Sequence, residues 1–165
     1  MTILDYTDIP TIRALLGVNT LELRDATLML PPYLLAVQDR LDLLNEQVSV
    51  RYFLVKDVPE ATRTVLQMRY YNQVQTYSAL AAAIEVMPTL PMAAPKSIED
   101  GKAKLDRIAD PYTALADSLE KSLSVIGLRI LDTLGKLDPT VLLPDRVVRN
   151  FAGVAALGVD PVTGA

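Results

Sequence analysis

The sequence predicts an all-α fold: a small helical bundle with two long helices, short N-terminal helices and an extended C-terminal tail. Apolar residues recur at three- and four-residue steps over 59–87 and 110–135, which is the spacing of one face of an α-helix. Residues that begin or end helices divide the first part of the chain into short segments. Hydrophobic residues make up 50% of the 165 residues, which is enough for the core of one domain.

The first helix is predicted to begin at Asp8 and to end at Gly17. The Asp8 side chain can cap free backbone N–H groups, and Pro10 falls in the first turn, where a missing N–H costs little. Gly17 tolerates the left-handed conformation that commonly ends a helix. Ile9, Ile12, Leu15 and Leu16 would form the apolar face.

Two further short helices are expected before residue 33. Asn19 and Glu22 have the spacing of a capping box, which predicts a short helix through Leu23. Asp25 is a candidate cap for another turn, and Pro31-Pro32 would stop it.

The middle of the chain is predicted to hold two helices. The first runs from about Tyr33 to Val48, and the second runs from Pro59-Glu60 to about Met87. Between them, residues 49–57 fit either a short strand or a continuing helix, and we favour a helical or irregular segment.

The prolines at 88, 91 and 95 predict an extended loop, followed by a turn at Asp100-Gly101. The last helix is predicted to start near Asp110-Pro111 and to end at Gly135. This division gives a helical domain over 1–135 and an extended C-terminal arm over 136–165.

Composition argues against catalysis. The chain has no histidine and no cysteine, so it lacks the usual acid–base group, the commonest metal ligand and any thiolate. Its carboxylates show no paired or calcium-loop spacing, and Gly101-Lys102 lacks the preceding glycine of a phosphate-binding loop. We therefore expect no catalytic residue, metal or cofactor. The N-terminus does not read as a signal peptide, and no apolar run is long enough for a bilayer, so no membrane partner is expected.

The arm is apolar, yet prolines and glycines interrupt it, so it is poorly suited to building a core of its own. Apolar residues of this kind should dock on something, either on their own domain or on a neighbouring protein. The candidate partner-interface residues are Val141, Leu142, Leu143, Val147, Val148, Arg149, Phe151, Val154 and Leu157.

The apolar stripe of the last helix is broader than one packing partner needs. It could belong to an ordinary central helix or to a surface for self-association. The charged segment 96–107 could be a solvated loop, a phosphate contact or a salt-bridge strip between subunits. The candidate subunit-interface residues are Val125, Leu128, Leu131, Lys102, Lys104 and Arg107.

Three tyrosines, Tyr70, Tyr71 and Tyr77, lie near Arg63 and Arg69 in the sequence. Such a group could stack on bases and contact phosphates. Tyrosines at helical spacing are more often core residues, and we favour that interpretation. The net charge of -4 also argues against a general phosphate-binding surface.

A resemblance to a known family is carried by the order of several short segments. Residues 11–18 read Thr-Ile-Arg-Ala-Leu-Leu-Gly-Val, residues 22–28 read Glu-Leu-Arg-Asp-Ala-Thr-Leu, and residues 30–33 read Leu-Pro-Pro-Tyr. A later segment, Asp100-Gly101-Lys102-Ala103 with Arg107, precedes the last long helix. In this order and spacing, the segments resemble bacteriophage head-to-tail adaptor (connector) proteins over about residues 1–110.

The resemblance implies a helical virion protein that forms a homo-oligomeric ring, usually of twelve subunits, beneath the portal at the head–tail junction. Such a ring extends the DNA channel, is passed by double-stranded DNA without sequence-specific binding and offers a docking surface for neck or tail proteins. The resemblance also implies a C-terminal segment that contacts the portal, and assembly in the host cytoplasm. The alternative is a small cytosolic helical protein that binds DNA or regulates another process.

Overall fold

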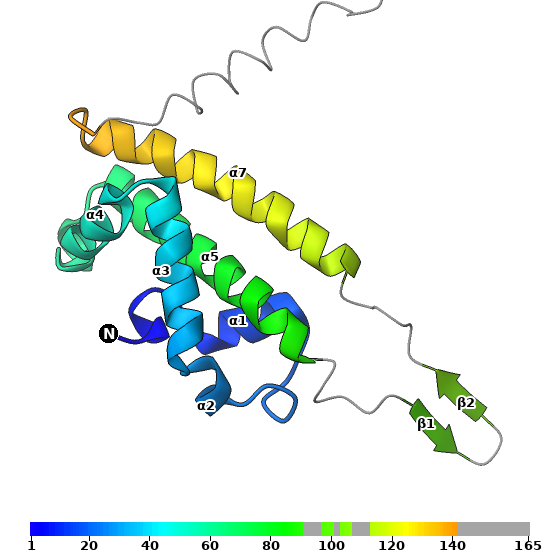
Figure 1. Cartoon of the computed structure of the whole chain (residues 1–165). Helices are drawn as coiled ribbons and strands as arrows, with labels where there is room; N and C mark the ends of the chain where they lie inside the picture. The colour runs from blue at the N-terminus through cyan, green and yellow to red at the C-terminus, as the bar shows by residue number, and fades with distance from the viewer. Residues whose placement is uncertain (91–96, 101–102, 107–112, 142–165) are drawn as a thin grey trace, which may run out of the picture.

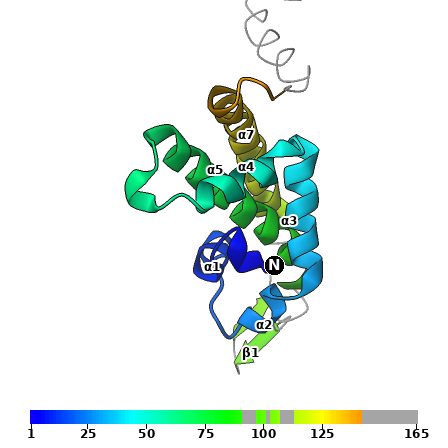
Figure 2. The same ribbon diagram turned by 90° about the vertical axis from the view of Figure 1, so that its left-hand side faces the viewer.

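The protein is an all-α helical bundle in the computed structural model, which describes residues 1–90 and 113–141 and the backbone of 97–100 and 103–106. Helix α5 lies at the centre and packs against α1, α3, α4 and α7, with its most extensive contact along α7 (Figure 1). The view turned by 90° shows α4 and the start of α5 forming a lobe beside the bundle (Figure 2). The helices are α1 (Ile9–Leu16), α2 (Asp25–Leu28), α3 (Pro31–Leu44), α4 (Gln47–Lys56), α5 (Val65–Val86) and α7 (Thr113–Leu137), with 3-10 turns η1 (Ile3–Asp5), η2 (Glu60–Thr62) and η3 (Met87–Thr89).

The first helix begins and ends at the residues that the sequence predicts. The Asp8 carboxylate accepts a hydrogen bond from the Thr11 N–H at 2.8 Å, and Gly17 ends α1 with φ of 66°. The side chains of Ile9, Ile12 and Leu16 are buried. Both predicted boundaries of α1 are therefore confirmed.

The next two predicted boundaries need correction. Asn19 and Glu22 make the reciprocal bonds of a capping box, but they close a turn and no helix follows. Asp25 is the first residue of α2 and does not cap it, because its carboxylate pairs with Arg13 of α1. The Arg13 guanidinium also donates to the Leu23 carbonyl, so the Arg13 side chain holds this turn against α1.

The helix predicted over 33–48 is two helices. Asn45 is extended, with φ of -173° and ψ of 135°, and this breaks the chain between α3 and α4. Its side chain accepts from the Gln47 N–H at 2.9 Å, which helps to begin α4. Val48 therefore belongs to α4, and the helical alternative for 49–57 is correct. Pro31 and Pro32 also begin α3, where they occupy its first turn.

The long central helix starts later than its apolar pattern predicts. Thr64 and Gln67 form a capping box, in which the Gln67 N–H donates to the Thr64 hydroxyl and the Thr64 N–H donates to the Gln67 side chain. Residues 60–62 form η2 instead of the first helical turn. Farther along α5, the four alanines at 79, 81, 82 and 83 are fully buried, and their small side chains let neighbouring helices approach closely.

Helix α7 runs two residues past its predicted end. Gly135 has no positive φ, so it continues the helix, and the chain turns only after Leu137. The predicted cap at Asp110-Pro111 lies outside the described residues. Before α7, strands β1 (Ser97–Asp100) and β2 (Ala103–Asp106) form an antiparallel hairpin in which Asp100 pairs with Ala103, and this agrees with the turn predicted there.

An aromatic stack joins the N-terminus to α4 and α5. The Tyr52 ring lies parallel to the rings of Tyr6 and Tyr71, with centroids 5.7 and 5.2 Å away, and Phe53 packs edge-on. The Lys56 ammonium donates to the Asp5 carbonyl at 2.9 Å and to the Asp5 carboxylate at 3.3 Å. Hydrogen bonding from the Thr2 N–H and then from Lys56 lowers the pKa of Asp5. Helix α4 thus holds the first residues in place.

Gly127 lies where α7 packs tightly against Leu44 and Tyr77. A Cβ atom there would lie 3.0 Å from Leu44 Cδ2 and 3.3 Å from Tyr77 Cε2. We expect Gly127→Ala to change the free energy of unfolding by less than about 1 kcal/mol, because the gain in helix propensity offsets a contact that the Leu44 side chain can relieve. We expect Gly127→Leu to cost about 1–3 kcal/mol by overpacking.

Urea denaturation of the two Gly127 variants would measure this difference. The exposed glycine Gly17 is unsuitable as a comparison because its φ is positive, so Gly135→Ala in the same helix is the control. Equal stability of Gly127→Leu and the wild type would contradict the packing described.

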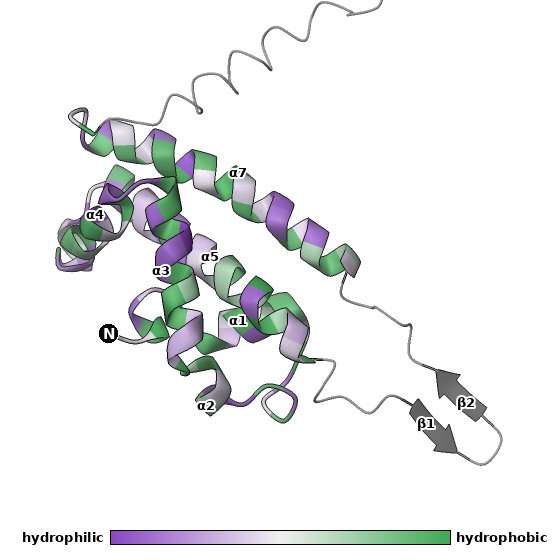
Figure 3. Ribbon diagram, viewed as in Figure 1, coloured by the Kyte–Doolittle hydropathy of each residue, from purple (hydrophilic) through white to green (hydrophobic). Residues whose placement is uncertain are grey.

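Among the described residues, no helix combines the length and the apolar character that a membrane crossing requires. Figure 3 shows apolar and polar residues alternating around α7, as expected for a helix with one buried side and one side facing water.

Candidate interaction surfaces

The buried ionisable groups of the described residues serve the fold. The Tyr70 hydroxyl donates to the Val48 carbonyl at 2.9 Å, and the Tyr77 hydroxyl donates to the Arg40 carbonyl at 3.2 Å. Burial raises the pKa of both phenols, so they stay neutral and act as hydrogen-bond donors between helices. Within the same residues, no group of three or more carboxylates is arranged to hold a metal ion.

The candidate DNA-binding residues do not form one accessible surface. Tyr70 is fully buried and Tyr77 is nearly so, which confirms their interpretation as core residues. Arg63 stacks its guanidinium on the Tyr71 ring at 4.5 Å and donates to three backbone carbonyls at the end of α4. Only Arg69 is exposed. Base stacking by this group would require the bundle to open.

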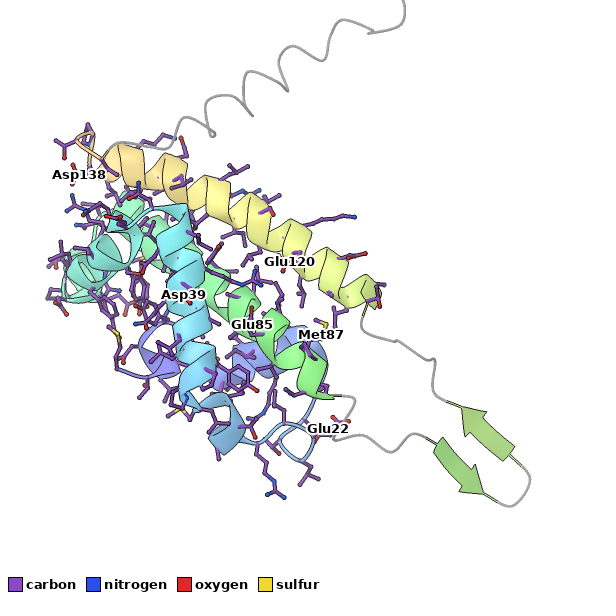
Figure 4. All side chains as sticks on the ribbon, in the orientation of Figure 1. Glu22, Asp39, Glu85, Met87, Glu120 and Asp138 are labelled. Carbon is purple, nitrogen blue, oxygen red and sulfur yellow. The ribbon has the colours of Figure 1, made fainter. Side chains whose placement is uncertain are left out.

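Arg40 links the three long helices. Its guanidinium donates to Glu85 of α5 at 3.0 Å and to Glu120 of α7 at 3.2 Å, as the labelled carboxylates in Figure 4 allow the reader to follow. Burial lowers the pKa of Arg40, but the bonds to Glu120 and Glu85 outweigh it and the net shift is upward. This cluster is an ion-pair network that joins three helices, and both carboxylates are already paired with Arg40.

The turn that follows α7 is held on α4. The Asp138 carboxylate pairs with Arg51 of α4 and accepts from the Thr140 N–H at 3.1 Å and the Thr140 hydroxyl at 2.5 Å. The Val141 N–H donates to the Asp138 carbonyl at 3.1 Å, which closes the turn. The chain therefore leaves the bundle from a fixed position.

A hollow of about 690 Å³ lies beside this turn. Carboxylates and amides form much of its wall, and apolar contact comes from Leu44 and Val141. The arm predicted to bind a partner begins at this hollow. Its described lining residues are Asp42, Leu44, Asn45, Glu46, Gln47, Asp138, Thr140 and Val141.

The turn should respond to acid. Hydrogen bonds from the Thr140 hydroxyl and N–H, together with Arg51, lower the pKa of Asp138 below its usual 3.8. A lowered pKa in the folded state stabilises the turn above pH 3.8, and this contribution is lost as the pH falls through the lower folded value. We expect the Thr140 amide shift in NMR to titrate with a midpoint below 3.8 and to stay flat in Asp138→Asn. A midpoint at or above 3.8 would contradict the contacts described.

Most of the predicted partner-interface residues lie outside the described residues. Val141 is the exception, and it is half-buried against the core at the start of the arm. The remaining eight are Leu142, Leu143, Val147, Val148, Arg149, Phe151, Val154 and Leu157.

The predicted subunit-interface residues are divided by the structure. Val125 is 48% exposed and Leu128 is partly exposed, so both can meet another molecule. Leu131 is only 3% exposed, which excludes it from a surface of the folded chain. The stripe on α7 is broad because α7 packs against α4 as well as α5. Lys102 and Arg107 lie outside the described residues, and Lys104 is described only as a backbone position in β2.

Comparison of the chain with models of protein families, with curated proteins and with solved structures found no match.

Proposed function

We propose that the protein is a structural virion component, a head-to-tail adaptor that forms a ring between the portal and the tail of a bacteriophage. The ring would extend the DNA channel and offer a surface to neck or tail proteins. It would assemble in the host cytoplasm and remain at the head–tail junction of the virion. The resemblance of the N-terminal segments and of the charged turn before α7 motivates this assignment.

The observation that carries the proposal furthest is the fixed start of the arm. The Arg51–Asp138 pair and the bonds of Thr140 hold the end of α7 on the bundle. Beyond this turn, the sequence is apolar and interrupted by Pro144, Gly153 and Gly158. A rigid body that carries an apolar arm is suited to adding a segment to a neighbouring protein. The portal is the neighbour that we propose.

The described surface supports an assembly role more than a chemical one. The buried tyrosines of the bundle hold helices together through hydrogen bonds, and Arg40 holds them together through ion pairs with Glu85 and Glu120. The net charge of -4 suits a channel wall past which DNA slides without adhering. Tyr70 is buried and the Arg63 guanidinium is bound to backbone carbonyls, and both facts disfavour the alternative of a small DNA-binding regulator.

Binding to the portal protein of the same phage would test the proposal. Co-sedimentation and cryo-electron microscopy of the full chain with portal rings should show an adaptor ring on the portal. We expect the double change Val148→Ser and Phe151→Ser to weaken binding at least about tenfold, because each removes apolar contact area. The neighbouring change Asn150→Ser serves as the control and should bind as the wild type does.

Two outcomes would overturn the proposal. One is a full chain that stays monomeric and does not bind the portal. The other is a gel shift in which the chain alone binds duplex DNA tightly and with strong dependence on salt, since that result would favour the DNA-binding alternative.

A further inference from the structure

The outward side of α3 is acidic and apolar. Leu35, Asp39, Asp42 and Leu43 are exposed there, with Leu35 at 56% and Leu43 at 85% exposure, and we call these four residues the α3 face. The Asp39 side chain has no hydrogen bond or ion pair among the described residues, and the Asp42 side chain has one long contact of 3.5 Å from the Ser49 hydroxyl. The only basic residue of α3 is Arg40, and it is turned towards Glu85 and Glu120.

The outward side of α7 has the opposite character. Lys121, Val125, Leu128 and Arg129 lie on successive turns, and we call them the α7 face. Neither the Lys121 side chain nor the Arg129 side chain has a hydrogen bond or ion pair among the described residues. Asp132 on the same side is paired with Lys136 at 2.6 Å, and the exposed Asp117 lies one turn before Lys121, so the net positive charge of the α7 face is smaller than its two bases alone would give.

Single exposed leucines are ordinary on a protein surface. Here each face has two apolar side chains, at least one of them exposed, beside two charged side chains that make at most one long contact, and the two charge signs are opposite. On the α3 face Leu35, Asp39 and Leu43 follow one another at four-residue steps. On the α7 face Lys121, Val125 and Arg129 do the same. Two such helices lying side by side can therefore place carboxylates against bases and leucines against Val125 and Leu128.

One copy cannot bring its own two faces together. Helix α3 packs its Val37 and Leu41 side into the bundle, and α7 packs its Ile130 and Leu134 side there. Both helices lie against α5 (Figures 1 and 2), and the exposed residues of the two faces are on the sides opposite these buried residues. Any contact between the α3 face and the α7 face must join two molecules.

We propose that copies of this chain associate head to tail, with the α3 face of one copy against the α7 face of the next. This inference rests on the proposed ring and names its subunit contact. Because the two surfaces differ, every open assembly keeps one free α3 face at one end and one free α7 face at the other, and association continues until a ring closes. The charges fix the register and orientation, and the apolar side chains are removed from water.

Charge reversal tests the contact in the full chain. We expect Asp39→Lys with Asp42→Lys, or Lys121→Glu with Arg129→Glu, to weaken self-association at least about tenfold in light scattering, because like charges then face each other. A mixture of the two double variants should associate again, since each supplies the sign that the other needs. Asp57→Lys with Glu60→Lys is the control, because these exposed carboxylates lie on neither face.

Cysteine cross-linking tests the same contact independently, since the chain has no cysteine of its own. A chain with both Leu43→Cys and Val125→Cys should give a ladder of dimers, trimers and larger species on mild oxidation. Each single cysteine variant should give no ladder. Dimers from the Leu43→Cys variant alone would indicate contact between two α3 faces and would overturn the head-to-tail pairing.

The outcomes separate the contact from the ring. If rings form and are unaffected by the charge reversals, this contact is wrong while the adaptor proposal stands. If the wild-type chain neither associates alone nor forms a ring on the portal, both proposals fail. Circular dichroism of each variant should retain the helical signal, so loss of association can be distinguished from unfolding.

Discussion

Replacing Tyr52 with alanine is expected to lower the free energy of unfolding by about 3–5 kcal/mol, the usual cost of removing a large buried aromatic side chain. Tyr52 is fully buried and its ring lies between those of Tyr6 and Tyr71. Stacking adds to the cost of the lost volume. The N-terminal segment should also loosen, because its Tyr6 ring loses the surface on which it packs.

The Tyr52→Phe variant separates the ring from its hydroxyl. The hydroxyl donates to the Asp5 carbonyl at 3.1 Å, but that carbonyl also accepts from Lys56 at 2.9 Å. Because the acceptor keeps a partner, we expect Tyr52→Phe to cost only about 1 kcal/mol. Thermal and urea denaturation would measure both variants, and similar losses for alanine and phenylalanine would contradict the stacking argument.

Arg63→Ala should produce the second largest loss, about 2–3 kcal/mol, because hydrogen bonds from a charged donor contribute more than neutral ones. The guanidinium donates to the carbonyls of Val55, Lys56 and Val58, which lie at and just beyond the end of α4. It also lies over the Tyr71 ring at 4.5 Å. A positive group at this end additionally complements the helix dipole.

Two variants make the Arg63 result specific. Arg63→Lys keeps the charge but not the planar fork, so it should recover only part of the loss. Arg69→Ala removes an exposed arginine of α5 that lies close to Arg63 in the sequence, and it should change stability by less than about 0.5 kcal/mol. Equal effects of Arg63→Ala and Arg69→Ala in urea denaturation would show that the carbonyl contacts contribute nothing.

The sequence was sufficient to predict features that depend on near neighbours. The Asp8 cap, the Gly17 stop and the helical spacing of the core tyrosines each involve residues a few positions apart. The break at Asn45 and the capping box of Thr64 and Gln67 are also local signals, and sequence reasoning missed them. In both places the continuous apolar pattern favoured one longer helix over two shorter elements.

Contacts between distant residues could not be predicted in this way. Arg51 and Asp138 are 87 positions apart, and their pairing depends on how α7 crosses α4. The sequence suggested only a possible phosphate contact for Arg63, because nothing in its local sequence indicates three carbonyl acceptors within reach. Leu131 was assigned to a subunit surface since its stripe seemed too broad for one partner, but α4 and α5 together cover that width.

Helix α4 has a mechanical consequence that follows from its two basic residues. Arg51 holds the turn from which the arm leaves, and Lys56 holds the first residues through Asp5. A pulling force on the arm would therefore pass through Asp138 into α4 and onward to the N-terminal segment, in addition to running along α7. The ten residues of α4 therefore connect the N-terminal segment to the turn before the arm. A force applied to the arm would be transmitted to the first residues of the chain.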